Sequence, residues 1–181
     1  DAKALVEKYF GEIKRRKEVE PLKPQPVTIA ETVRLYHEDN FANTAQLNMV
    51  WPTTYQYTDD AYALDFLSEL VSSGKKAPMY KVLEKEKELS SQFYAYNNSQ
   101  VLAGEFHVTV TANSGKSLND VEKGIFEAFA RFEKDGVTDR DVERIKAGLE
   151  TGFYNGISSV LGKSFQLAQY NTFAGDPGFI E

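Results

Sequence analysis

Apolar residues recur along much of the chain three or four residues apart, which is the spacing of one helical face. This period predicts six helices, in residues 1–13, 59–73, 78–89, 117–136, 138–156 and 161–173. Ser117 and Thr138 each begin a sequence that resembles a capping box, with Asp in place of the usual Glu. Glycines fall every four residues in the fifth helix, at positions 148, 152 and 156. They share one face, where we expect another backbone to approach closely.

Strict alternation of apolar and polar residues marks a second kind of element. It predicts strands in residues 33–38, 44–51, 90–100 and 104–112. In the second of these, Leu47, Met49 and Trp51 alternate with other residues in the manner of a sheet with one buried face. The predicted order is α, β-β, α-α, β-β, α-α-α. This order indicates an α+β fold, a two-layer sandwich with helices on one face of a mostly antiparallel sheet.

A connector separates the first helix from the remaining elements. Residues 14–28 are first basic and then rich in proline, at positions 21, 24 and 26, which favours an extended chain. The sequence begins inside a helix and stops after a turn-like stretch at residues 175–178, as expected of a segment of a larger protein. We therefore expect residues 1–28 to be the last helix of a preceding domain plus a linker, and residues 29–181 to be an α+β domain.

Composition and charge narrow the classes of function. A net charge of −6 offers no basic surface for a nucleic-acid backbone. No apolar run approaches the length of a membrane span. The chain has no cysteine, which excludes disulfides and thiolate metal sites and fits the cytosol and the periplasm equally well. From this fragment the compartment stays open.

No catalytic constellation is visible in the sequence. His37 and His107 lie in different predicted strands, and His37 belongs to neither H-E-x-x-H nor H-x-x-E-H. Two histidines at a surface or interface are therefore favoured over a metal site. There is no G-x-S-x-G sequence for a nucleophilic serine. Acidic residues alternate with lysines in residues 84–88, which is typical of a solvated helix face.

One polar run has a composition that suits peptide contact. It extends from Tyr94 to Gln100 and contains Tyr, Asn and Ser side chains. An exposed strand of this kind can receive an extended peptide by backbone pairing. The alternative is an ordinary hairpin whose tyrosines pack against a neighbouring element, and the residues alone favour it.

Four segments together resemble the insulinase/pitrilysin superfamily of zinc metallopeptidases. They are DAKALVEKYFGEI, DDAYALDFLSELVSSGKKAPMYKVLEKEKELSSQFYAY, GVTDRDVERIKAGLETGFY and LAQYNTFAGDPGF. Their order and spacing resemble the end of the family's first domain followed by its second, non-catalytic domain. The resemblance implies a structural and substrate-chamber domain of a zinc-dependent metalloendopeptidase that cleaves peptides. It also implies that the catalytic domain of the same parent chain is the partner, and that zinc binds there at an upstream H-x-x-E-H motif.

The chain departs from the family at the residues that clamp substrate. Members often have L-R-x-K-x-x-L-x-Y in this domain, but the Arg position holds Glu84 and the Tyr position holds Ser91. Neither role carries over, and we expect no catalytic, cofactor or metal residue in this fragment. We expect Tyr94, Tyr96 and Asn97 to form the wall that meets peptide. The alternative function is a non-catalytic scaffold or binding subunit with the same fold.

Overall fold

The structure is a computed structural model that describes residues 1–14, 16–17, 19–20 and 22–179. Pro21, one of the three prolines of the predicted connector, lies outside the described residues. The elements, in chain order, are α1 (Ala2–Phe10), β1 (Gln46–Thr53), α2 (Asp59–Ser72), η1 (Tyr80–Glu86), β2 (Gln92–Ser99), β3 (Gly104–Thr111), α3 (Leu118–Asp135), α4 (Asp139–Gly156), α5 (Val160–Gln169) and η2 (Tyr170–Ala174).

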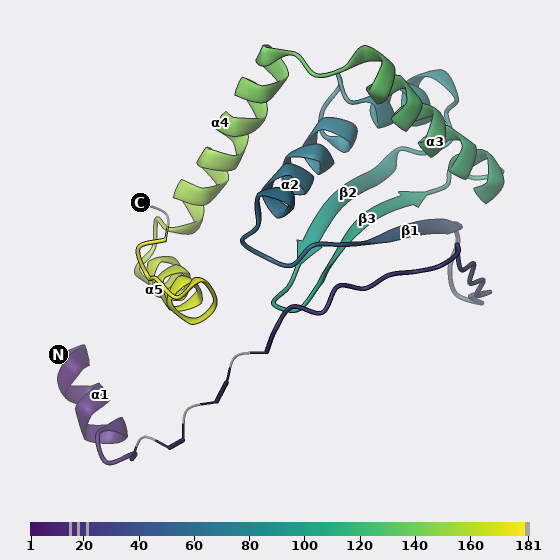
Figure 1. Cartoon of the computed structure of the whole chain (residues 1–181). Coiled ribbons are helices and arrows are strands. Elements are labelled where there is room, and N and C mark those ends of the chain that lie inside the picture. Colours follow the sequence, from purple (N-terminus) through teal and green to yellow (C-terminus); the bar gives the residue numbers. More distant parts are fainter. Residues whose placement is uncertain (15, 18, 21, 180–181) are drawn as a thin grey trace.

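The sheet has three antiparallel strands in the order β1-β3-β2. Val108 lies opposite Met49 on one side and Ala95 on the other, so the apolar positions of all three strands share one face. Figure 1 shows α2 and α3 on the same side of this sheet. The predicted α+β sandwich, with helices on one face of an antiparallel sheet, is confirmed.

The core lies between the sheet and these helices. Its fully buried side chains come from every layer: Met79, Val82, Leu83, Val108, Val110, Val121 and Ile125. At one side of this core the ring of Trp51 packs against Phe106 and Phe129, with centroid distances of 6.3 and 6.1 Å. The alternation in β1 and β3 and the apolar stripe of α3 therefore meet as the sequence predicts.

The predicted helix at residues 78–89 is wider than an α-helix over much of its length. Within it, η1 is a π-helical element from Tyr80 to Glu86. Lys87 N–H donates to the Val82 carbonyl at 3.1 Å, and Leu89 N–H donates to the Leu83 carbonyl at 2.7 Å. This wide turn places both Val82 and Leu83 in the core.

Two expectations from the sequence are wrong. No strand forms at residues 33–38, where the chain is extended but unpaired. The glycines of α4 do not mediate close packing, because a Cβ atom built at Gly148, Gly152 or Gly156 would have no neighbour within 4 Å. The physical reason is that α4 extends away from the sheet, and Ile145 is its only buried residue.

A different glycine performs the role expected of those in α4. A Cβ atom at Gly124 of α3 would lie 2.8 Å from Leu83 Cδ2 and 2.9 Å from Leu89 Cδ1. The missing side chain is therefore what lets α3 and η1 approach each other over the sheet. Among the described residues, no helix is both long enough and apolar enough to cross a membrane.

Candidate functional site

The face of the sheet turned away from the helices is the surface that carries the predicted tyrosines. We call it the open face and define it by alternate residues of the three strands: Gln46, Asn48 and Val50 of β1, Glu105, His107, Thr109 and Thr111 of β3, and Gln92, Tyr94, Tyr96 and Asn98 of β2. Tyr94 lies opposite Thr109, and Thr109 lies opposite Asn48, to which its hydroxyl donates at 2.9 Å.

An aromatic row runs across the middle of the open face. The rings of Tyr96 and His107, which face each other on β2 and β3, are stacked with centroids 4.6 Å apart and planes within 1°. The ring of Tyr94, two residues earlier on β2, also stacks with that of Tyr96, with centroids 6.0 Å apart. His107 Nε2 lies 2.9 Å from a carboxylate oxygen of Glu105. Because Tyr94 is 53% exposed and Tyr96 is 41% exposed, this row is available to a ligand.

Asn97 does not belong to the open face. Its amide points to the helix side, where Nδ2 is within hydrogen-bonding distance of the Ala61 carbonyl (3.2 Å) and of Asp65 Oδ1 (3.0 Å). Its Oδ1 accepts a hydrogen bond from the Thr53 hydroxyl at 3.3 Å. Burial raises the pKa of Asp65, and the hydrogen bond from Asn97 partly offsets that rise. Asn97 thus links β2 to both α2 and β1.

Replacing Asn97 by alanine is expected to lower the free energy of unfolding by about 1–3 kcal/mol, because partly buried polar groups of α2 and β1 lose their partner. Chemical unfolding followed by circular dichroism measures this loss. Asn98→Ala is the matched control, because Asn98 accepts a bond only from the exposed side chain of Gln100 among the interactions described. Equal losses in the two variants would contradict the linking role of Asn97.

The outer edge of β2 is hydrogen-bonded to helix α2 at one position. Ala95 N–H donates to the Ser72 hydroxyl of α2 at 3.2 Å, and that hydroxyl donates onward to the Ser68 carbonyl at 2.8 Å. A peptide strand cannot pair with β2 at this point without displacing Ser72. The backbone edge of β2 is therefore closed at this point, and what β2 exposes is the side chains of Tyr94 and Tyr96.

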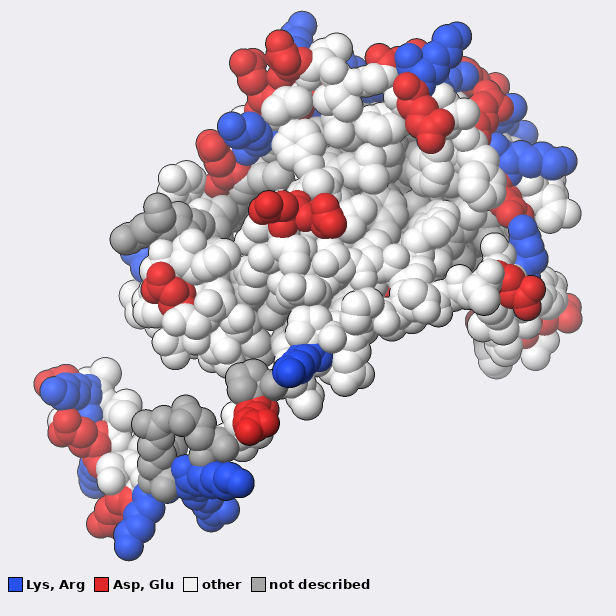
Figure 2. Space-filling model, viewed as in Figure 1, with Lys and Arg blue, Asp and Glu red and all other residues white. Residues whose placement is uncertain are grey.

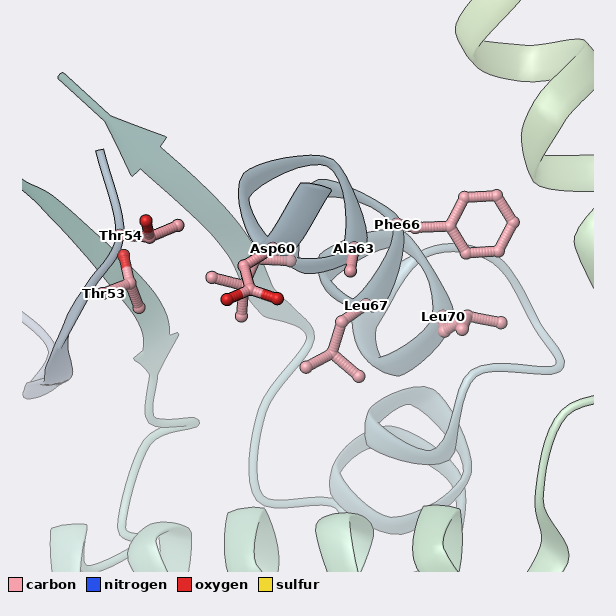
Figure 3. A pocket seen from close by; sticks show the side chains of 8 residues that line it. Thr53, Thr54, Asp60, Ala63, Phe66, Leu67 and Leu70 are labelled. Carbon is pink, nitrogen blue, oxygen red and sulfur yellow. The ribbon is translucent and has the colours of Figure 1, made fainter. Parts of the chain in front are cut away.

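An apolar hollow beside α2 is a large concavity that sequence reasoning missed. It has a volume of about 670 Å³ and lies between α2 and the end of β1 (Figure 3). Leu64, Leu67 and Leu70 line it, together with the carboxylate-bearing Asp60. The sequence places Leu64 and Leu67 on one helical stripe with Leu70 beside it, but a stripe does not show which of its residues a neighbouring element leaves uncovered.

On the face drawn in Figure 2, most charged side chains lie along the rim. Figure 2 shows acidic and basic side chains interspersed along the upper rim over α3 and at α1, while the middle of that face carries few. Within the part of the chain that the structure describes, no group of three His, Asp or Glu residues is arranged to hold a metal ion. The open face with its aromatic row is therefore the candidate site.

The family model of the peptidase M16 inactive domain matches residues 1–149 of the chain. The chain belongs to the peptidase M16 inactive-domain family. This agrees with the resemblance found in the sequence, because the matched description is that of a non-catalytic domain of zinc-protease-like proteins. No curated protein matches the chain.

Solved structures show the same fold for this M16 inactive domain. A protease from Helicobacter pylori is similar with a TM-score of 0.71 and 19% identity over 93% of this chain and 41% of that protein. A peptidase M16 inactive domain from Pseudomonas fluorescens has a TM-score of 0.63 and 14% identity over 77% of this chain and 32% of that one. A protein from Bordetella pertussis, provisionally named a zinc protease, has a TM-score of 0.65 and 13% identity over 77% and 75%. The M16 inactive domain described here therefore spans less than half of the first two proteins.

Proposed function

We propose that the chain is the non-catalytic wall of the substrate chamber in a zinc-dependent metalloendopeptidase that cleaves peptides. In this proposal the catalytic domain of the same parent chain is the partner and supplies the zinc through an H-x-x-E-H motif. The observation that carries the proposal is the match of residues 1–149 to the peptidase M16 inactive domain. The ligand set for zinc does not fit the residues described here, so the metal and its chemistry are assigned to the parent.

Three features of the domain support a role in meeting peptides. The aromatic row of Tyr94, Tyr96 and His107 presents flat, amphipathic surfaces, which suit peptide side chains and backbone alike. The open face has Gln, Asn and Thr side chains around this row, and these can donate to and accept from a peptide backbone. The departures at Glu84 and Ser91 remove the family's usual substrate clamp, so peptide contact would fall to the open face.

A second function is favoured by those same departures. With Glu84 and Ser91 in place of the clamping Arg and Tyr, the chain also suits a scaffold or binding subunit that works without an active partner domain. The two functions differ in one sequence feature, the presence of H-x-x-E-H in the upstream domain of the parent.

The deciding experiment is peptide cleavage by the full-length parent with and without a zinc chelator. Cleavage that the chelator abolishes, with none by the 181-residue chain alone, is the expected result. A folded, zinc-supplied parent that cleaves none of a varied peptide set would overturn the peptidase function in favour of the scaffold. Cleavage by the isolated chain would overturn its non-catalytic role.

In the active parent, Tyr96→Ala is expected to raise KM for peptides several-fold with a smaller effect on kcat. The reason is that the tyrosine would bind the peptide equally well in the ground state and in the transition state, and would take no part in the bond cleavage. Steady-state kinetics with a short peptide series measures the two constants. Tyr154→Ala is the control, since Tyr154 is exposed on α4, far in sequence from the open face. If Tyr96→Ala leaves KM unchanged, the open face is not the peptide-contacting wall.

A further inference from the structure

The charge of the open face is concentrated at one end. Among the residues that define this face, Glu105 is the only carboxylate, and none is a lysine or an arginine. Glu105 lies near the end of β3 at which the strand begins, opposite Asn98 of β2. At the far end an uncharged row crosses the three strands, made of Gln46, Thr111 and Gln92. The open face is therefore acidic at one end and carries no fixed charge over the remainder.

The carboxylate of Glu105 has room for a further partner. Its side chain is 55% exposed, and one of its oxygens, Oε2, lies 2.9 Å from Nε2 of His107. Within the described residues, the other oxygen has no hydrogen-bond partner, and neither oxygen is within ion-pair distance of a lysine or an arginine. A carboxylate accepts several hydrogen bonds at once, so the contact with His107 leaves acceptor positions free.

Aromatic rings lie next to this carboxylate. Tyr96 of β2 is opposite His107, which is two residues after Glu105 on β3 and on the same face. Glu105 and Tyr96 are therefore diagonal neighbours, a pair whose backbones are about 7–8 Å apart in an antiparallel sheet. Tyr94 adds a second exposed ring beside that of Tyr96. A side chain as long as that of arginine or lysine spans this separation, so it reaches the carboxylate and a tyrosine ring together.

This combination of groups favours a positively charged ligand. The quadrupole of an aromatic ring attracts a cation, and arginine makes this contact more often than lysine. The planar guanidinium stacks on rings and donates two parallel hydrogen bonds to a carboxylate. An acidic side chain, in contrast, is repelled by Glu105 and meets no lysine or arginine among the residues of the open face. Ring and carboxylate together therefore favour arginine over neutral and acidic side chains.

From these observations we propose that Glu105 and Tyr96 form a subsite of the open face that takes an arginine side chain of a bound peptide. The inference rests on the proposed function, because it requires the open face to be the wall that meets peptide. Glu105 is then a specificity-determining residue that takes no part in bond cleavage. The uncharged end of the open face sets no charge requirement for the remainder of the peptide.

Two matched peptides test the proposal on the 181-residue chain. One is acetylated and amidated Thr-Phe-Thr-Arg-Thr-Phe-Thr, and the other has citrulline in place of arginine, which keeps the shape of the side chain and removes its charge. Titrations followed by the amide chemical shifts of β2 and β3 give the two dissociation constants. At low salt the arginine peptide is expected to bind about fivefold more tightly, because an exposed ion pair and a cation–π contact each contribute a factor of about two to five at most.

Two pairs of variants assign the preference to its groups. Glu105→Gln should reduce the preference for the arginine peptide to about twofold, which is what the rings contribute without the carboxylate. Glu150→Gln is the matched control, because it changes the net charge equally at an exposed position of α4, and it should retain the full preference. Tyr96→Leu should also reduce the preference, whereas Tyr96→Phe keeps the ring and should retain most of it. Circular dichroism checks that each variant folds.

The possible results separate this inference from the proposed function. Equal binding of the two peptides by the unaltered chain would overturn the inference and leave the open face as a peptide-contacting wall without selection by charge. An equal loss of preference in Glu105→Gln and Glu150→Gln would also overturn it, because net charge would then be the cause. Binding of neither peptide would overturn the inference together with the peptide-contacting role of the open face. A parent that binds the arginine peptide selectively but cleaves no peptide would overturn the peptidase function and support the subsite.

Discussion

Replacing Ile125 by alanine is expected to lower the free energy of unfolding by about 2–5 kcal/mol. Ile125 is fully buried in α3 and belongs to the core formed by the helices and the sheet. The loss has two parts, the transfer free energy of the deleted methyl and methylene groups and the cavity left among neighbours that relax only in part. Urea unfolding of the 181-residue chain, followed by circular dichroism, measures it.

The adjacent residue provides the control. Phe126 is larger than Ile125 but half exposed on the same helix, so Phe126→Ala should cost much less, near the range of surface substitutions, about 0.5 kcal/mol. A larger loss for Phe126→Ala than for Ile125→Ala would contradict the placement of α3 on the sheet. It would also place the face of α3 that carries Phe126 inside the core.

Replacing Gly124 by valine is expected to cost about 1–3 kcal/mol, because a branched side chain has no room between α3 and η1. The first added carbon alone would lie 2.8 and 2.9 Å from the side-chain ends of Leu83 and Leu89. Both leucines are buried, so neither can move aside without disturbing the core. The higher helix propensity of valine relative to glycine offsets only a few tenths of a kcal/mol.

Gly148→Val on α4 is the matched control for this substitution. A side chain at Gly148 would meet nothing within 4 Å, so only the small gain in helix propensity remains. The two variants should therefore differ in sign when their unfolding free energies are compared with the unaltered chain. A destabilisation of equal size at both positions would show that valine destabilises each helix by itself. It would contradict a clash with neighbouring side chains as the cause at Gly124.

The sequence predicts the fold correctly where a segment with one apolar face packs against another such segment of the same chain. Alternation in β1 and β3 and the apolar stripe of α3 each predict one buried face, and all three faces meet in the core. The segment at residues 33–38 has the same alternation, but none of its backbone groups is hydrogen-bonded to the backbone of the described residues. Alternation indicates that a segment can form a strand, while pairing also depends on what lies beside it.

The placement of the predicted site shows a second limit. Tyr94, Tyr96 and Asn97 are close in sequence, yet adjacent residues of a strand face opposite sides, so Asn97 is separated from the tyrosines. The two-residue period of a strand is by itself enough to predict this separation. In contrast, no rule in the sequence predicts the stacking of Tyr96 on His107, because it depends on the register between two strands.

The glycines of α4 and the hollow beside α2 share one physical cause. Equal spacing places residues on the same helix face, but whether that face is covered depends on tertiary packing. Gly148, Gly152 and Gly156 lie on an uncovered helix, and Leu64 and Leu67 line a surface that is only partly covered. Gly124 has no such repeat around it, and it is the glycine that a neighbouring element approaches.

The position of Trp51 gives the protein a built-in optical reporter. It is the only tryptophan in the chain, and its ring lies against Phe106 of the sheet and Phe129 of α3. Any event that separates the helical layer from the sheet moves this indole from an apolar contact into water, which shifts its emission to longer wavelength. Fluorescence from this one residue therefore reports whether the helical layer and the sheet remain packed together, without a label and without interference from another indole.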